Sequence, residues 1–403
     1  MKLPLKHPGV IAIIAAGFAS FGLSTDMTLA SLPGMVRYFG ISVSQAQLTL
    51  SAFVLAFALS QLVYGPLSDR YGRRTTMLAG NLVYLFATVA CAVAPSIEVL
   101  IAARFFQAIG GCAWAVVGRA VVRDIHGAEG TARMMGIIGV SQSLLIVVGP
   151  IIAGQLEQSF GWRANFGFLL AFGAVLTLAA ALLLDESHPD RNPRDTDIGQ
   201  MLKNYATLAA NRRIWGYILC NAFVFACILA FHSGASFVLM ELLGVSALEF
   251  GLLFSLTILG YMGGSFVTVR WVARFGADRL LAWGTALGMA AGTAMVALAF
   301  AGVHSVAAII APYFVFLVSV GFTQPAAIAG AIGPYTRIAG TASALFGFVQ
   351  LSFGSLAGYV VGRLYDGTPM PMAAAIGIGT WGAFLSFQLL VRRAPITRAS
   401  SRP

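Results

Sequence analysis

The stretch at residues 65–75, GPLSDRYGRRT, decides how the rest of the chain is interpreted. Four charged residues interrupt an otherwise apolar region here: Asp69, Arg70, Arg73 and Arg74. Charged side chains need contact with water or with partners, so this stretch is expected to lie outside the apolar layer. Gly65 and Pro66 are expected to end the preceding apolar run, and Gly72 provides a position without a Cβ atom. The stretch is therefore predicted to form a tight connection between two helices.

The composition predicts an integral membrane protein. Of 403 residues, 58% are hydrophobic and 10% are charged, whereas a soluble globular protein has roughly 25% charged residues. The four cysteines lie in apolar segments without CxxC spacing, which argues against a disulfide framework and a zinc site, and no metal site is expected. The first apolar run follows Lys2 and Lys6 without a cleavage signal, so we expect it to be a retained helix.

Gaps between charged residues predict twelve membrane-spanning helices, because about 20 apolar residues cross the hydrocarbon core as a helix. The fold class is therefore expected to be all-α. The predicted spans are residues 9–36, 44–65, 75–95, 97–120, 133–155, 163–184, 213–240, 248–269, 279–301, 304–328, 338–362 and 371–391. The uncharged run at residues 280–335 must hold two of them, with a turn at residues 302–305.

The distribution of basic residues predicts the orientation. Of the 25 Lys and Arg residues, Arg104 lies inside a span and Arg37, Arg163 and Arg363 lie in the loops opposite the termini. The other 21 lie at the termini, or in loops and adjoining span ends on the same side as the termini. By the positive-inside rule, both termini and residues 65–75 are predicted to be cytoplasmic. This arrangement also explains the net charge of +10 without a nucleic-acid partner.

The longest polar segment, residues 185–212, is predicted to be a cytoplasmic linker between two six-helix halves, residues 1–184 and 213–403. Five apolar residues within it recur at helical spacing and predict a short amphipathic surface helix: Ile198, Met201, Leu202, Tyr205 and Leu208.

Three short matches between the halves support a repeat origin. RYG at 70–72 is echoed by RFG at 274–276, GTA at 130–132 by GTA at 340–342, and GPIIAG at 149–154 by GYVVG at 358–362.

Over essentially its whole length the chain resembles the major facilitator superfamily, specifically its twelve-helix proton-coupled drug-efflux branch. GPLSDRYGRR resembles the signature of the loop between helices two and three. RFFQAIGG at 104–111 resembles the fourth-helix signature, and VGPIIAG at 148–154 resembles the fifth-helix signature associated with antiporters.

Within that branch, the chain looks like the Bcr/CflA group of drug-resistance transporters. The matching segments are STDM at 24–27 followed by LP at 32–33, RAVVRD at 119–124 and GTASALFG at 340–347. The group often carries Tyr after Asp-Met, whereas Thr28 stands here. This departure concerns the drug contacts more than the coupling.

Two charged residues lie well inside predicted spans: Asp26 in the first and Arg104 in the fourth. From the expected outer ends of their helices they lie at similar depths, ~15 Å and ~10 Å. Burial and a nearby guanidinium act in opposite directions on the proton affinity of a carboxyl group, so a movement that changes either one loads or releases a proton. Asp26 and Arg104 are therefore predicted to couple proton movement to transport. A fixed structural ion pair, or an Asp that binds cationic drugs, is the alternative.

The resemblance implies that Asp69, Arg73 and Asp124 form a cytoplasmic charge network that latches the outward-open state. The full predicted latch comprises Gly65, Asp69, Arg70, Gly72, Arg73 and Asp124. The alternative is a set of charges in water that only set the topology, where exposed pairs contribute ~0–1 kcal/mol. In the second half Ala273 stands where the Asp is expected, so a symmetric latch is expected to be missing or weak.

Helix five contains Gly149, Pro150 and Gly154, which predict either a bend that moves during transport or close helix packing. A substrate cavity is expected to be apolar and rich in aromatic residues. Its candidates, each of which can instead pack or face lipid, are Phe21, Met27, Phe53, Phe57, Gln107, Trp114, Gln142, Phe223, Phe231, Tyr261, Tyr313 and Gln350. His232, in the middle of helix seven, is read as a buried histidine with its hydrogen bonds made, with proton relay as the alternative.

No HExxH, P-loop or GxSxG motif occurs, so an enzyme or an ATP-driven pump has little support. The leading expectation is a monomeric proton/drug antiporter of the bacterial inner membrane that uses the proton gradient and no cofactor. It would export lipophilic drugs by rocking of the two halves around a central cavity. The alternatives are a proton-coupled exporter of a metabolite, such as an amino acid or a sugar, and a transporter-like sensor without turnover.

Overall fold

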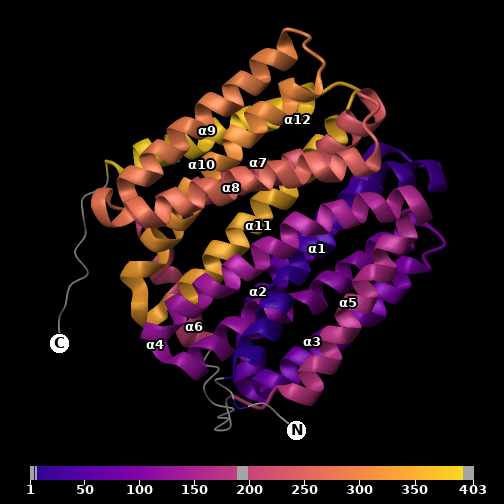
Figure 1. Cartoon of the computed structure of the whole chain (residues 1–403). Helices are drawn as coiled ribbons and strands as arrows, with labels where there is room; N and C mark the ends of the chain where they lie inside the picture. The colour runs from indigo at the N-terminus through magenta and orange to yellow at the C-terminus, as the bar shows by residue number, and fades with distance from the viewer. Residues whose placement is uncertain (1–3, 5–6, 188–197, 394–403) are drawn as a thin grey trace. The chain divides into compact units, whose positions relative to one another are not determined.

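The computed structural model describes residue 4, residues 7–187 and residues 198–393. Within its helices, the side chains of residues 127–133, 136, 139–144, 146, 198, 200–202, 204, 336, 337 and 339 lie outside the description. Every regular element of the described chain is a helix, as the sequence predicts (Figure 1).

The first five helices cover the predicted N-terminal half. They are α1 (Pro8–Phe39), α2 (Val43–Tyr71), α3 (Arg73–Ala92), α4 (Ile97–Phe160) and α5 (Trp162–Leu183). Local signals mark several of the ends. Gly40 closes α1 in the left-handed conformation, and the side chains of Ser42 and Gln45 form a capping box at the start of α2.

The helix α4 contains both the fourth and the fifth predicted spans and must reverse its direction. A straight helix of its 64 residues would be about 96 Å long. However, Arg163, just after α4, donates a hydrogen bond of 3.2 Å to the carbonyl of Ala94, just before it. Both ends of α4 therefore lie at the same end of the bundle, and the element crosses it twice. The predicted connection at 121–132 is assigned to the helix, which corrects the expectation of a loop.

The remaining elements also follow the predicted spans. They are α6 (Ile198–Ala209), α7 (Arg212–Ser236) with the π-helix η1 (Phe237–Leu242), α8 (Ala247–Phe275), α9 (Ala277–Phe300), α10 (Val306–Ile332) with the 3-10 helix η2 (Gly333–Ile338), α11 (Ala339–Leu364), and α12 (Met370–Ser386) with the π-helix η3 (Phe387–Val391). The turn between α9 and α10 contains Gly302, and Ser305 caps α10, as the sequence predicts.

Among the described residues, eleven helices are long and apolar enough to cross a membrane. The predicted fifth span, 133–155, lies in the second part of α4, where several side chains are not described. Large apolar side chains point outward from these helices: Phe86 and Val269 are each 75% exposed. In water such surfaces are costly, whereas lipid covers them at no cost, so these faces suit a bilayer.

The chain divides into two compact units. Unit 1 contains residues 1–196, 232–256 and 358–367, and unit 2 contains residues 197–231, 257–357 and 368–403. Helices α7, α8 and α11 each contribute to both units. The predicted division of the chain into 1–184, 185–212 and 213–403 stays a prediction.

The connection from α2 to α3 is shorter than the sequence suggests. Gly65 and Pro66 do not end the preceding helix, because α2 continues through them to Tyr71. Pro66 is tolerated within the helix, and the turn is made at Gly72, where φ is +94°. The corresponding turn between α8 and α9 is made at Gly276, where φ is +78°. The predicted repeat of RYG and RFG thus marks the same local structure twice.

The amphipathic helix predicted in the linker is present as α6. Its Leu208 is fully buried in a hydrophobic cluster of unit 2 that also contains Ile214 and Tyr217. The apolar face of α6 is therefore anchored to unit 2 through this residue. The four cysteines are buried and free.

Candidate functional site

Asp26 lies buried in α1, with 6% of its surface exposed. Its Oδ1 atom lies 3.8 Å from Nδ1 of His232, in the part of α7 that belongs to unit 1. The His232 ring packs against Phe254 of α8, with 5.1 Å between the ring centroids. Nδ1 of His232 is buried and has no hydrogen-bond partner, so the expectation of a histidine with its hydrogen bonds made is wrong at this atom.

Arg104 is fully buried in α4 and interacts with uncharged groups. Its Nη1 atom donates a hydrogen bond of 2.6 Å to Gln107, and Gln107 donates one of 2.8 Å to Thr88. The guanidinium lies 4.0 Å from the ring centroid of Phe53, a cation–π contact. Although both residues are described, no ion pair joins Arg104 to Asp26. Asp26, which the sequence placed at a depth similar to that of Arg104, therefore faces His232 and not Arg104.

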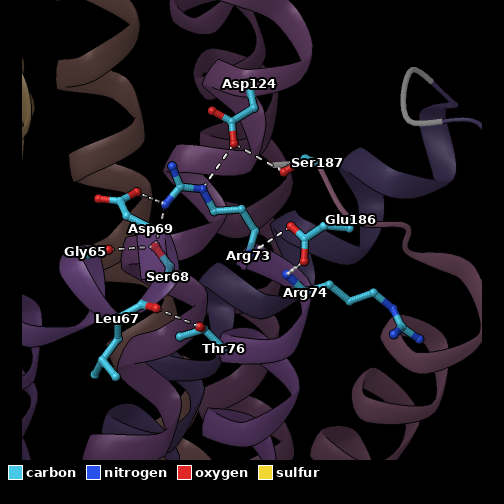
Figure 2. A network of polar contacts seen from close by, with 10 residues as sticks. All are labelled: Gly65, Leu67, Ser68, Asp69, Arg73, Arg74, Thr76, Asp124, Glu186 and Ser187. Carbon is cyan, nitrogen blue, oxygen red and sulfur yellow. Dashed lines mark hydrogen bonds and ion pairs between the residues drawn. The ribbon is translucent and has the colours of Figure 1, made fainter. Parts of the chain in front are cut away.

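The predicted charge network is assembled within unit 1 (Figure 2). Arg73 forms an ion pair with Asp69, one turn earlier. Its Nε atom donates a hydrogen bond of 3.1 Å to Asp124 of α4, and its Nη1 atom donates one of 2.6 Å to Ser68. Arg73 is 8% exposed, so these bonds are shielded from water more than a surface pair is. The structure thus brings together the three residues that the resemblance names.

Sequence reasoning missed the part that Glu186 plays in this network (Figure 2). Its carboxylate accepts hydrogen bonds from the backbone N–H groups of Arg73, at 2.9 Å, and Arg74, at 3.3 Å. These donors are orphan groups at the start of α3, so Glu186 acts as the cap that α3 lacks in its own sequence. Ser187 adds a bond of 3.3 Å to Asp124. Glu186 lies 113 residues along the chain from Arg73, and no spacing rule indicates such a partner.

Two predicted latch residues stand apart from these ion pairs. Arg70 is exposed and contacts the ring of Tyr71, 5.3 Å from its centroid. Gly65 contributes its carbonyl, which accepts a bond of 2.9 Å from Ser68.

In unit 2, Asp278 at the start of α9 accepts bonds from Arg213, at 2.7 Å, and Tyr217, at 2.6 Å. The second half thus uses a different pairing, consistent with Ala273 in place of an acid.

The glycines of the predicted helix-five bend lie at close approaches between helices of unit 1. A methyl group on Gly149 would lie 2.7 Å from Cδ2 of Leu23 in α1. One on Gly154 would collide with the backbone at Ala247, at the start of α8. Pro150 lies inside α4, and a Cβ atom on Gly251 of α8 would collide with its carbonyl. These contacts support the packing role, and the moving bend stays a prediction.

Several predicted cavity residues cluster around Arg104. The ring of Phe21 lies 4.4 Å from that of Phe57 and 5.8 Å from that of Phe53. Met27 is fully buried next to Asp26 in the sequence. Trp114, which is also fully buried, packs against Gly17 and donates a bond of 2.9 Å to Asn81, so it fills the space between helices.

The other cavity candidates lie in unit 2, except Gln142. Phe231 stacks on Tyr313 with 3.4 Å between centroids, and Phe223 contacts Phe353. Tyr261 pairs with Gln324 and Gln350 pairs with Asn221 through hydrogen bonds of 3.1 and 2.7 Å. Gln142 lies outside the described side chains. A cavity lined by all of these residues stays a prediction.

Polar residues toward the C-terminal end of α1 and at the start of α2 form contacts that sequence reasoning did not find. Ser31 donates a bond of 2.6 Å to Glu157 of α4. Arg37 forms an ion pair of 2.5 Å with Glu241 of η1, and Gln47 of α2 donates to the carbonyl of Ser233 at 2.5 Å. Within unit 1, residues 232–256 are therefore tied to α1 and α2 by polar contacts as well as by packing.

Comparisons with known proteins agree with this architecture. The family model described as Major Facilitator Superfamily matches residues 14–359. A chloramphenicol resistance protein of Pseudomonas aeruginosa is 31% identical over 360 residues, which cover 88% of this chain and 83% of the relative. A bicyclomycin resistance protein homolog of Haemophilus influenzae is 27% identical over 393 residues, or 95% and 96% of the two chains.

The fold also matches a solved structure. The peptide transporter POT in complex with sulfate superposes with a TM-score of 0.78 at 13% identity, over 97% of this chain and 96% of that one. At this identity the match concerns the fold alone. The resemblance read from the sequence motifs is confirmed: the chain is a multi-pass membrane transporter that belongs to the Major Facilitator Superfamily.

Proposed function

We propose that this protein is a proton-coupled antiporter that exports lipophilic small molecules from the cytoplasm across the bacterial inner membrane. The resistance proteins among its relatives support drugs as the substrate class. In this proposal the protein acts as a monomer, both termini are cytoplasmic, and the proton gradient drives export without a cofactor. The excess of Lys and Arg on one side of the predicted spans supports the orientation.

The observation that carries the proposal is the buried carboxyl group of Asp26. An ionisable group within the apolar part of a membrane protein is costly and normally serves transport or proton movement. Asp26 is 6% exposed and lies in α1 one residue before Met27, on a helix that contacts both α4 and the C-terminal end of α7. A proton bound there changes the charge of a site that several helices share.

Alternating access requires contacts that hold one state and break in another. The network around Arg73 is the candidate for the cytoplasmic side, because it joins α2, α3, α4 and the segment after α5. The contacts of residues 232–256 with α1 and α2 are the candidate for the opposite side. In our proposal, proton binding at Asp26 changes which of these two sets is the more stable.

The test uses inverted membrane vesicles from a bacterial strain without its own efflux pumps. Wild-type protein is expected to accumulate chloramphenicol or another drug of a resistance panel when the vesicles are acidified inside, and an ionophore should abolish the accumulation. Asp26→Asn should remove the accumulation while the protein remains inserted. The matched control is Glu98→Gln, an exposed acid at the start of α4. Accumulation of amino acids or sugars but of no drug would instead favour the metabolite exporter, and undiminished transport by Asp26→Asn would exclude Asp26 as the coupling group.

A further inference from the structure

We propose that His232 shares the coupling proton with Asp26, so that the two side chains form one proton-binding unit between α1 and α7. The inference rests on the proposed proton coupling. Its basis is geometric: Asp26 Oδ1 and His232 Nδ1 are 3.8 Å apart, both side chains are buried, and Nδ1 has no hydrogen-bond partner. A buried nitrogen without a partner costs free energy, and the facing carboxylate is the acceptor that a small approach would supply.

Among the residues whose side chains the structure describes, the other groups around the pair give this proton no competing ionic partner. From α8, Phe254 packs on the imidazole ring. From α2, the uncharged Gln47 bonds to the carbonyl of Ser233, next to His232. From α3, the hydroxyl of Tyr84 lies 2.9 Å from Ser24, two residues before Asp26.

From α4, the guanidinium of Arg104 is bonded to Gln107 and stacked on Phe53. Within the described residues, the contact that Asp26 makes with another ionisable side chain is the one with His232.

Sharing one proton keeps the buried pair neutral. With one proton, the pair is either carboxylate with imidazolium or carboxylic acid with neutral imidazole, and its net charge is zero in both forms. In the transfer, the N–H bond at Nδ1 breaks and an O–H bond forms at Oδ1, with no other change. Loss of that proton leaves a net charge of −1 and gain of a second leaves +1, and either is costly away from water.

The position of His232 gives this proton a mechanical consequence. His232 is the first residue of the segment 232–256 that belongs to unit 1. That segment is bound to α2 at Ser233 and to α1 at Glu241. A neutral pair lets the end of α7 stay against α1. A second proton, or none, favours separation of the end of α7 from α1, so the protonation state of the pair acts on the contacts that alternating access must break.

Transport by purified full-length protein in proteoliposomes tests the shared proton separately from the proposed proton-coupled transport. We expect His232→Gln to lower chloramphenicol transport driven by a pH gradient about tenfold or more, since it removes one of the two sites that hold the proton. Exchange of labelled for unlabelled chloramphenicol needs no net proton movement and should persist, which shows that the variant is folded. His304→Gln, an exposed histidine in the loop before α10, is the control that should behave as wild type.

A double variant tests whether the two groups act as a unit. If they share one proton, the pH dependence of chloramphenicol exchange is lost to the same degree in Asp26→Asn, in His232→Gln and in the double variant, because each change removes the same function. Changes in pH dependence that add in the double variant would overturn the inference. So would a His232→Gln variant with wild-type transport and a wild-type pH profile, while the proposed function would still stand.

A measurement without substrate covers the case in which chloramphenicol is not transported. The chain has five histidines, and replacing His7, His126, His188 and His304 by Gln leaves His232 as the only imidazole. In nanodiscs, ¹⁵N NMR of that imidazole then follows its protonation. Its titration midpoint is expected to differ by about one pH unit or more between Asp26 and Asp26→Asn backgrounds. Identical titration, or an imidazole that stays neutral at every pH in both backgrounds, would exclude the shared proton.

Discussion

At the scale of single residues, the two glycines of the sequence GPLSDRYGRR have different backbone roles. Gly72 has φ of +94° and ψ of 152°, a region that residues with a side chain avoid. Gly65 lies inside α2, and a Cβ atom built on it meets nothing within 4 Å. A Gly→Ala substitution is therefore expected to have opposite effects on stability at Gly72 and at Gly65, although both are glycines of one motif.

Gly72→Ala is predicted to lower the free energy of unfolding by about 1–3 kcal/mol, because alanine would be strained in this conformation. Gly65→Ala should be neutral or raise stability by about 0.5–1 kcal/mol, since alanine favours a helix interior. Because all four cysteines are buried and free, a thiol-reactive dye reports thermal unfolding of the purified protein in detergent. Equal melting temperatures for the two variants would show that the turn is not strained by a side chain.

At the scale of elements, Arg73 connects three helices, whereas Arg70 connects none. Arg73 donates to Ser68 and Asp124 and pairs with Asp69, and its backbone N–H is bonded to Glu186. Arg70, three residues earlier, is exposed and its one interaction in the described chain is with the ring of Tyr71. The last turn of α2, the start of α3 and the middle of α4 are thus held together by one guanidinium.

We predict that Arg73→Gln costs about 1–3 kcal/mol of stability, because it leaves two carboxylates without their partner. Arg70→Gln changes an exposed side chain and should stay within about 0.5 kcal/mol of wild type. If the network also acts as a latch, Arg73→Gln should slow drug transport and Arg70→Gln should not. Dye-reported melting and vesicle transport of both variants provide the comparison, and equal transport by the two would leave the network a purely structural role.

At the scale of the whole molecule, the transport cycle proposed here requires the contact between the end of α1 and η1 to open. The ion pair of Arg37 and Glu241 marks this contact, and its side chains are 65% and 44% exposed. An exposed pair contributes only ~0–1 kcal/mol, so it does not by itself hold the contact. A covalent bond at the same place would hold it in every state.

The cross-link of an Arg37→Cys, Glu241→Cys double variant by a short bismaleimide is predicted to reduce transport about tenfold or more, since the open state becomes inaccessible. Each single variant treated with the same reagent should retain transport, because one modified thiol forms no bridge. The buried native cysteines should not react under native conditions. Full transport by the cross-linked protein would mean that α1 and η1 do not separate during the cycle.

Most of the fold could be predicted from the sequence because the bilayer restricts it. Spans must be apolar over about 20 residues, so gaps between charges locate them within a few residues of the observed helices. The amphipathic spacing of α6 and the glycine turns at Gly72 and Gly276 are local signals of the same kind. The end of α2 was predicted too early because Pro66 is tolerated within the membrane helix.

The candidate site also contains features that local sequence predicts and features that depend on contacts between distant residues. The sequence by itself determined which charges are expected within the apolar layer, Asp26 and Arg104, and its motif resemblance determined that Asp69, Arg73 and Asp124 are expected together. Only the tertiary structure decided that Asp26 faces His232, about 200 residues away, that Arg104 meets Gln107 and Phe53, and that Glu186 caps α3. The physical reason is that hydrophobic periodicity records which residues leave water, whereas a polar side chain meets its partner through the packing of helices distant in the chain, which no local pattern encodes.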